Sequence, residues 1–174
     1  FALRHQGDLL RKASDFSAAL SVYDSLIQKY PNHANRYLAE LSRLDCMLAL
    51  ANEQNRYEYK EIILQLERLL DLPNLPQAFR FEVIYKLAFL WVKVEELHLA
   101  KALIIEEVVT VLGNNQLVEE ITEIDRYWVA RSFFLLSELL EKNGSTEECK
   151  KIYRLIIAYN LPGSDLAKEL LKDI

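Results

Sequence analysis

The chain has 174 residues, carries 21 basic and 26 acidic side chains, and is 51% hydrophobic. This length is enough for one domain of ordinary size with a real core. The net charge of −5 argues against nucleic acid as a partner, because phosphates attract a basic face. No apolar run reaches the roughly 18 residues that a membrane-spanning helix needs.

The composition is that of an all-α protein. Four glycines and four prolines fall mostly between apolar runs with helical spacing, and no strand-like alternation persists. Cys46 and Cys149 lie on apolar helical faces, which favours buried free thiols over a disulfide. Because the chain opens with Phe1 rather than Met, we expect it to be a piece of a longer chain.

Residues 3–31 predict two short helices joined by a tight turn. The first helix has small and apolar residues on one face, at Leu3, Gly7 and Leu10. The second carries one apolar stripe, formed by Phe16, Ala19, Leu20, Tyr23, Leu26 and Ile27. Ser14 is the expected cap of the second helix, and Pro31 cannot continue it. Two small residues, Gly7 and Ala19, would let the helix backbones approach closely.

This opening resembles the tetratricopeptide repeat, a helical hairpin with apolar, small and aromatic residues at fixed positions. The matching residues are Leu3, Gly7, Leu10, Phe16, Ala19, Tyr23 and Pro31. The alternative is an ordinary helical hairpin within a bundle. The resemblance implies stacked hairpins in which the first helices line a concave groove and the second helices form the outer wall.

Further hairpins are predicted along the rest of the chain. Helices are expected at about 34–51 and 56–70, with Asn55 capping the later one. A clearer unit follows, and its two helices carry apolar and small residues at the family's spacing: Ile84, Leu87, Ala88, Trp91, Leu97, Ala100 and Ile104. The run Gly113-Asn114-Asn115 suits a left-handed cap at its end.

The last full unit is expected to open with a long helix that starts at Gln116 or Ile121 and ends at Lys142. Its first-helix positions are filled by Phe133, Leu136, Ser137 and Leu140. Ser145 with Glu148 predicts a capping box for the following helix. We therefore expect an all-α, right-handed superhelix in one domain of TPR-like units, divided at 1–33, 34–76, 77–115 and 116–162, with a capping helix at 163–174.

The resemblance also implies which side chains would face a partner in the groove. They are Arg4, Arg11, Tyr85, Lys86, Phe89, Lys93, Arg131 and Phe134. Exposed aromatic residues are the usual anchors of peptide binding. A neighbouring helix could instead bury Tyr85 and Phe89. A clamp for a partner's terminal carboxylate is not expected, because Asp8 stands where such a clamp has an asparagine.

No catalytic, cofactor or metal site is predicted. His5, His33 and His98 have no carboxylate or thiol at a triad or metal spacing, and no phosphate-binding loop occurs. We expect a scaffold that binds a protein or peptide and does not insert into a membrane.

The charge is unevenly distributed, because residues 61–125 contain 5 basic and 12 acidic side chains. A basic partner or, more simply, a solvated helix face would explain this. The alternative function is a spacer or assembly segment of a larger helical-repeat protein, for instance one associated with a bacterial outer membrane. Such a segment would self-associate through its ends.

Overall fold

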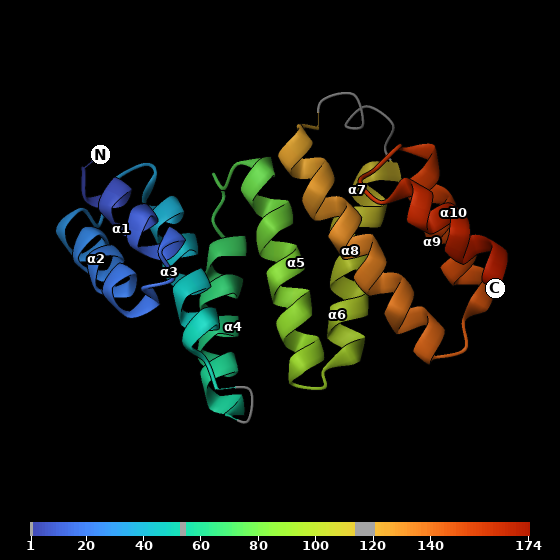
Figure 1. The fold of residues 1–174 in the computed structure, drawn as a ribbon, viewed down its shortest axis with the longest axis horizontal. Coiled ribbons are helices and arrows are strands. Elements are labelled where there is room, and N and C mark those ends of the chain that lie inside the picture. The colour runs from blue at the N-terminus through green and yellow to red at the C-terminus, as the bar shows by residue number, and fades with distance from the viewer. Residues whose placement is uncertain (1, 53–54, 114–120) are drawn as a thin grey trace. The chain divides into compact units, whose positions relative to one another are not determined.

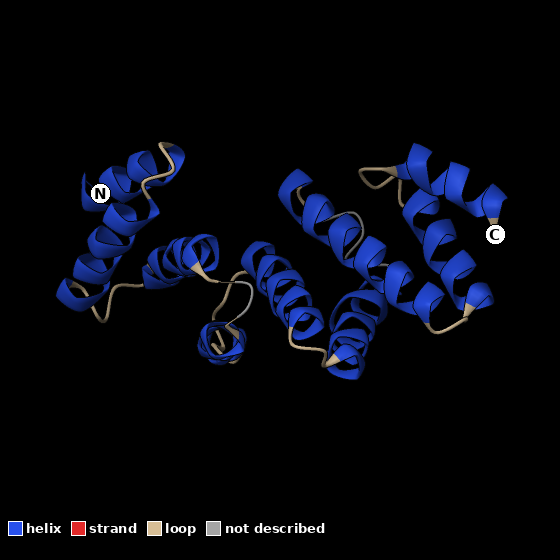
Figure 2. Ribbon diagram, turned by 60° about the horizontal axis from the view of Figure 1, so that its bottom comes forward, coloured by secondary structure: helices blue, strands red, loops and turns tan. Residues whose placement is uncertain are grey.

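A computed structural model describes residues 2–52, 55–113 and 121–174, and within them it contains helices and connecting turns but no strand (Figures 1 and 2). The all-α prediction is therefore confirmed. The chain divides into two compact units, Phe1–Leu72 and Pro73–Ile174. The handedness of a superhelix and the division into four repeats remain predictions.

The first unit contains four helices: α1 (Ala2–Lys12), α2 (Phe16–Lys29), α3 (Arg36–Leu50) and α4 (Arg56–Leu70). Each packs on the next along the chain, so that hairpins lean on their successors (Figure 1). This is the arrangement of a helical repeat. The fourth helix has the predicted bounds, and the Asn55 side chain accepts a hydrogen bond from the Tyr57 N–H at 3.2 Å, as expected of its cap.

The first hairpin closes around Gly7 and Tyr23. A Cβ on Gly7 would lie 2.7 Å from the Tyr23 ring, so the ring occupies the space that a side chain would fill. Tyr23 is fully buried, and its hydroxyl donates to Asp8 Oδ1 at 2.7 Å. Burial, with the Asp8 carboxylate next, raises the pKa of Tyr23 to about 12. The close approach predicted at Gly7 therefore serves a buried aromatic ring.

The cap predicted at Ser14 is wrong. Asp15 is the N-cap of α2, and its carboxylate accepts from the Ala18 N–H at 3.1 Å. Ser14 has a φ of 62°, in the left-handed region that a tight interhelical turn requires. The turn therefore uses Ser14 for its backbone conformation and Asp15 for the helix end, where a carboxylate also complements the helix dipole.

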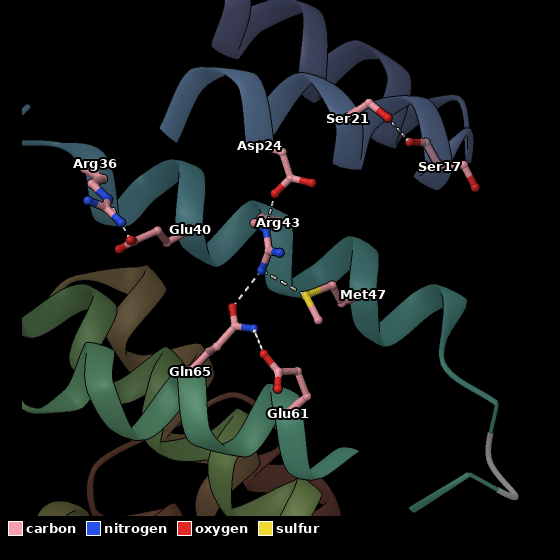
Figure 3. A network of polar contacts seen from close by, with 9 residues as sticks. All are labelled: Ser17, Ser21, Asp24, Arg36, Glu40, Arg43, Met47, Glu61 and Gln65. Atoms are coloured by element: carbon pink, nitrogen blue, oxygen red, sulfur yellow. Dashed lines mark hydrogen bonds and ion pairs between the residues drawn. The ribbon is translucent and has the colours of Figure 1, made fainter. Parts of the chain in front are cut away.

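Arg43 links three helices of the first unit. From α3, its guanidinium pairs with Asp24 of α2 and donates to Gln65 Oε1 of α4 at 2.6 Å (Figure 3). The same nitrogen lies 3.1 Å from the Met47 sulfur. Arg43 therefore makes polar contacts with both helices that neighbour α3 in the chain.

The second unit contains seven helical segments among its described residues: α5 (Gln77–Lys93), α6 (Leu97–Ile104), η1 (Ile105–Val109), α7 (Thr110–Gly113), α8 (Glu123–Lys142), α9 (Thr146–Ala158) and α10 (Ser164–Asp173). The segment η1 is one π-helical turn inside an otherwise continuous helix. Packing is again between neighbours: α5 contacts α6 and α8, α8 contacts α9, and α9 contacts α10 (Figure 1).

One helix start and one capping box in this unit differ from the predictions. The long helix α8 begins at Glu123 because Thr122 and Asp125 form a capping box. The capping box expected at Ser145 is absent, since the Ser145 side chain makes no cap hydrogen bond. The predicted left-handed cap falls on Asn114 and Asn115, which lie outside the described residues.

Both cysteines are buried free thiols, as predicted. Burial raises the pKa of Cys46 and of Cys149, so the reactive thiolate is disfavoured at both. The final helix α10 packs on α9, and its start at Gly163 has a φ of 85°. A Cβ there would lie 2.8 Å from the Phe134 ring, so glycine is required for both space and conformation.

Candidate functional site

The side chains that stand out chemically gather on the joint face of α5 and α8. Tyr85 and Phe89 of α5 have ring centroids 6.2 Å apart, and Tyr85 lies 5.5 Å from Trp128 of α8. Tyr127 packs edge-on against Trp128 at 5.0 Å. Together with Arg131 these four residues define what we call the aromatic–arginine surface. Two of its five members are classed as exposed, Tyr127 at 45% and Arg131.

Arg131 is held by the rings around it. Its guanidinium donates to the Tyr127 hydroxyl at 2.9 Å and to the Tyr85 hydroxyl at 2.8 Å. Its central carbon lies 4.5 Å from the centroid of the Tyr85 ring and 5.7 Å from that of Trp128. Partial burial works to lower the pKa of Arg131, but the two tyrosine oxygens outweigh it and the pKa is raised. Arg131 is therefore a permanently charged, oriented cation.

Two lysines flank this surface in different states. Lys86 is 8% exposed, forms an ion pair with Glu82 one turn away, and lies 5.5 Å above the Trp128 ring. Lys93 is exposed and lies 5.5 Å from the Phe89 ring. Lys86 is thus paired and enclosed, whereas Lys93 is exposed at the end of α5.

The structure brings together five of the predicted groove residues: Tyr85, Lys86, Phe89, Lys93 and Arg131. It adds Tyr127 and Trp128, which the sequence prediction does not include. A signal was present: Tyr127 and Arg131 are four residues apart, so they share a helix face.

Phe134 lies elsewhere. Its ring centroid is 6.4 Å from that of Tyr153, and Gly163 packs closely against it. Phe134 therefore helps to join α8 to α9 and to the start of α10.

The two remaining predicted residues belong to the first unit, and both are paired. Arg4 lies 3.6 Å from Asp8, and Arg11 lies 2.7 Å from Asp45 of α3. Arg4 also lines a pocket of about 830 Å³, whose apolar wall includes Leu26, Ile27 and Ala39. His5 and His33 also line this pocket.

Two other kinds of feature, a metal-holding cluster and a membrane-spanning helix, are absent from the described ranges. No group of three or more His, Cys, Asp or Glu side chains in residues 2–52, 55–113 and 121–174 is placed to hold a metal ion. Over the same ranges, every helix is too short or too polar to cross a membrane.

The tetratricopeptide repeat family model matches residues 1–33. No curated protein and no solved structure matches the chain. Repeats of this family generally mediate protein–protein interaction. Residues 1–33 are therefore similar to a tetratricopeptide repeat, and the packing of consecutive helices in both units is that of an all-helical repeat.

Proposed function

We propose that this chain is a protein-interaction scaffold and that the aromatic–arginine surface on α5 and α8 binds a peptide or a segment of a partner protein. α5 and α8 are the first helices of their hairpins, so this is the face that would line a groove. The observation that carries the proposal is the gathering of three aromatic types and an arginine on one face, where Tyr127 and Arg131 are exposed and the other rings are half-buried.

The residue types match those that dominate binding energy at protein interfaces. Tryptophan, tyrosine and arginine are enriched at energetic hot spots, and rigid rings lose little conformational entropy when they bind. The rings already pack on one another and on Arg131, so a partner would meet a largely preformed surface. Ile124, one turn before Tyr127 on α8, is 63% exposed and extends the apolar area.

The test uses peptides selected from a phage-displayed random library on the whole chain. Binding of a selected peptide to wild type is compared by fluorescence anisotropy with binding to Tyr127→Ser. Tyr57→Ser is the matched control, because Tyr57 is an 82% exposed tyrosine on α4 that also has a lysine near its ring, at 5.9 Å. We expect the Tyr127 change to weaken binding about tenfold or more and the Tyr57 change to leave it unaltered.

Hydrogen exchange provides an independent readout of the same surface. Bound peptide should protect the backbone amides of α5 and α8. Protection confined to other helices, or equal affinity for the two variants, would overturn the proposal. A chain that binds no selected peptide but self-associates in sedimentation experiments would favour the spacer alternative.

A further inference from the structure

We infer that the aromatic–arginine surface selects an acidic residue in its partner, with Arg131 receiving the carboxylate and the neighbouring rings receiving an adjacent apolar side chain. This inference rests on the proposed function, and it adds the chemistry of the segment that binds. It depends on the surroundings of Arg131 rather than on the family resemblance.

The first step is the hydrogen-bonding capacity of Arg131. A guanidinium has five N–H donors in a rigid fork. Within the described part of the chain, its acceptors are the hydroxyls of Tyr85 and Tyr127, both neutral groups. No carboxylate there forms an ion pair with it. Donors that suit a bidentate carboxylate therefore remain available on an exposed, positioned cation.

Arg131 differs from several other cations of the chain in what surrounds it. Lys86 has its own carboxylate, Glu82, and is enclosed. In the first unit Arg4, Arg11 and Arg43 each pair with an aspartate. Arg131 is surrounded by aromatic rings instead, and these favour the cation without neutralising it.

The net charge of the chain bears on how an acidic segment would be selected. The chain as a whole carries a net charge of −5, so its overall field does not attract an acidic peptide. A preference for acidic segments would therefore report on a local contact. Tyr127 and Ile124 offer apolar area beside Arg131, so the fitting ligand is a carboxylate next to an aromatic or aliphatic side chain.

The first readout is the composition of the peptides selected on wild type. We expect them to be enriched in aspartate or glutamate beside an apolar residue. Selection of basic peptides, or of peptides with no acid preference that still require Tyr127, would overturn the acidic preference and leave the binding surface itself intact. Peptides that do not require Tyr127 would instead overturn the proposed function.

The second readout is a double-mutant cycle between the chain and a selected peptide labelled with fluorescein. Arg131→Gln should weaken binding about 10- to 100-fold, and changing the acid of the peptide to glutamine should remove that sensitivity. Arg154→Gln, on the exposed side of α9, is the charge-matched control and should leave affinity unchanged. Arg131→Lys should bind with intermediate affinity, because it keeps the charge and loses the fork.

A purely structural role for Arg131 predicts a different pattern. In that case Arg131→Gln would lower the melting temperature, and it would weaken the binding of the acidic peptide and of its glutamine variant equally. Equal losses for the two peptides would overturn the inference, whatever the melting temperature.

Discussion

The α1–α2 hairpin and the α8–α9 hairpin have the same internal design built from different residues. Each second helix has a small buried residue followed four positions later by a buried tyrosine, Ala19 and Tyr23 in one and Cys149 and Tyr153 in the other. Each tyrosine hydroxyl donates to a carboxylate of the first helix, at 2.7 Å and 2.9 Å respectively.

The difference lies on the first helix. The position twelve residues before the small residue is Gly7 in the first hairpin and Ser137 in the α8–α9 hairpin. Gly7 leaves space for the Tyr23 ring, whereas Ser137 is buried, donates to the Phe134 carbonyl at 2.8 Å and has Cys149 Sγ 3.7 Å from its own carbonyl oxygen. The family model matches only the first of these hairpins. The α8–α9 hairpin thus keeps the tyrosine packing of the first hairpin without the glycine that accompanies it there.

The largest expected effect comes from removing either tyrosine. Tyr23→Ala and Tyr153→Ala should each lower the free energy of unfolding by about 3–5 kcal/mol, because each empties a site of a large buried ring. Hydrogen exchange should locate the first loss in residues 1–72 and the second in residues 73–174. Tyr57→Ala is the control and should change stability by less than about 0.5 kcal/mol. A small effect at only one tyrosine would mean that the two hairpins are not equivalent.

The next largest effect on stability should distinguish Gly7 from Ser137, the equivalent positions of the two first helices. Gly7→Ala should destabilise by about 1–3 kcal/mol, because the new methyl group meets a fully buried ring. Gly113→Ala is the matched control, since no described residue lies within 4 Å of its Cβ position, and it should be neutral or stabilising. Ser137→Ala should cost about 1 kcal/mol, because its buried hydroxyl donates to the Phe134 carbonyl and also hydrogen-bonds with Tyr153. Urea unfolding followed by circular dichroism measures all three.

Structural features that depend on local contacts could be predicted from the sequence, and features that depend on distant contacts could not. Apolar periodicity placed α4 at its observed bounds, and the spacing of Gly7, Ala19 and Tyr23 identified the first hairpin. Helix caps were read less well. Ser14 and Asp15 are adjacent and both can cap, and the left-handed turn decides between them.

The candidate surface shows the same limit. Tyr85 and Phe89 could be assigned to one face of a helix from their spacing alone. Trp128 could not be assigned to that face, because its position depends on how α5 packs against α8. Lys86 is enclosed by Trp128 of another helix, and Phe134 packs against Gly163 instead of lying on the surface. Both outcomes depend on contacts between residues that are distant in sequence.

The free energy of unfolding should fall by a smaller amount at high pH, because Tyr23 titrates. The pKa of Tyr23 is raised to about 12 in the folded chain, against about 10 in the unfolded chain, so the stability that this neutral tyrosine contributes is complete below about pH 10. It is lost as the pH rises toward 12, by about 1.4 kcal/mol at about pH 11.

Tyr23→Phe removes the titrating hydroxyl while keeping the ring, so the stability gap between wild type and this variant should narrow over that window. Urea unfolding at several pH values measures the gap, and Tyr57→Phe serves as the control. A gap that stays constant from about pH 8 to about pH 11 would contradict the raised pKa.

The smallest expected effect is a difference in salt sensitivity between two arginines that link neighbouring helices, Arg43 in the first unit and Arg126 in the second. Arg43 pairs with Asp24, whose side chain is 50% exposed, so Arg43→Leu should cost about 1 kcal/mol at low salt and less at about 1 M NaCl. In the second unit Arg126 donates to the carbonyls of Tyr159 and Asn160 at 2.7 and 2.6 Å, at the end of α9. These acceptors carry no net charge, so the loss from Arg126→Leu should change less with salt. Thermal melts at two salt concentrations compare the pair, with Arg154→Leu as the exposed control. Equal salt sensitivity at Arg43 and Arg126 would mean that charge pairing contributes no more to the first unit than carbonyl capping does to the second.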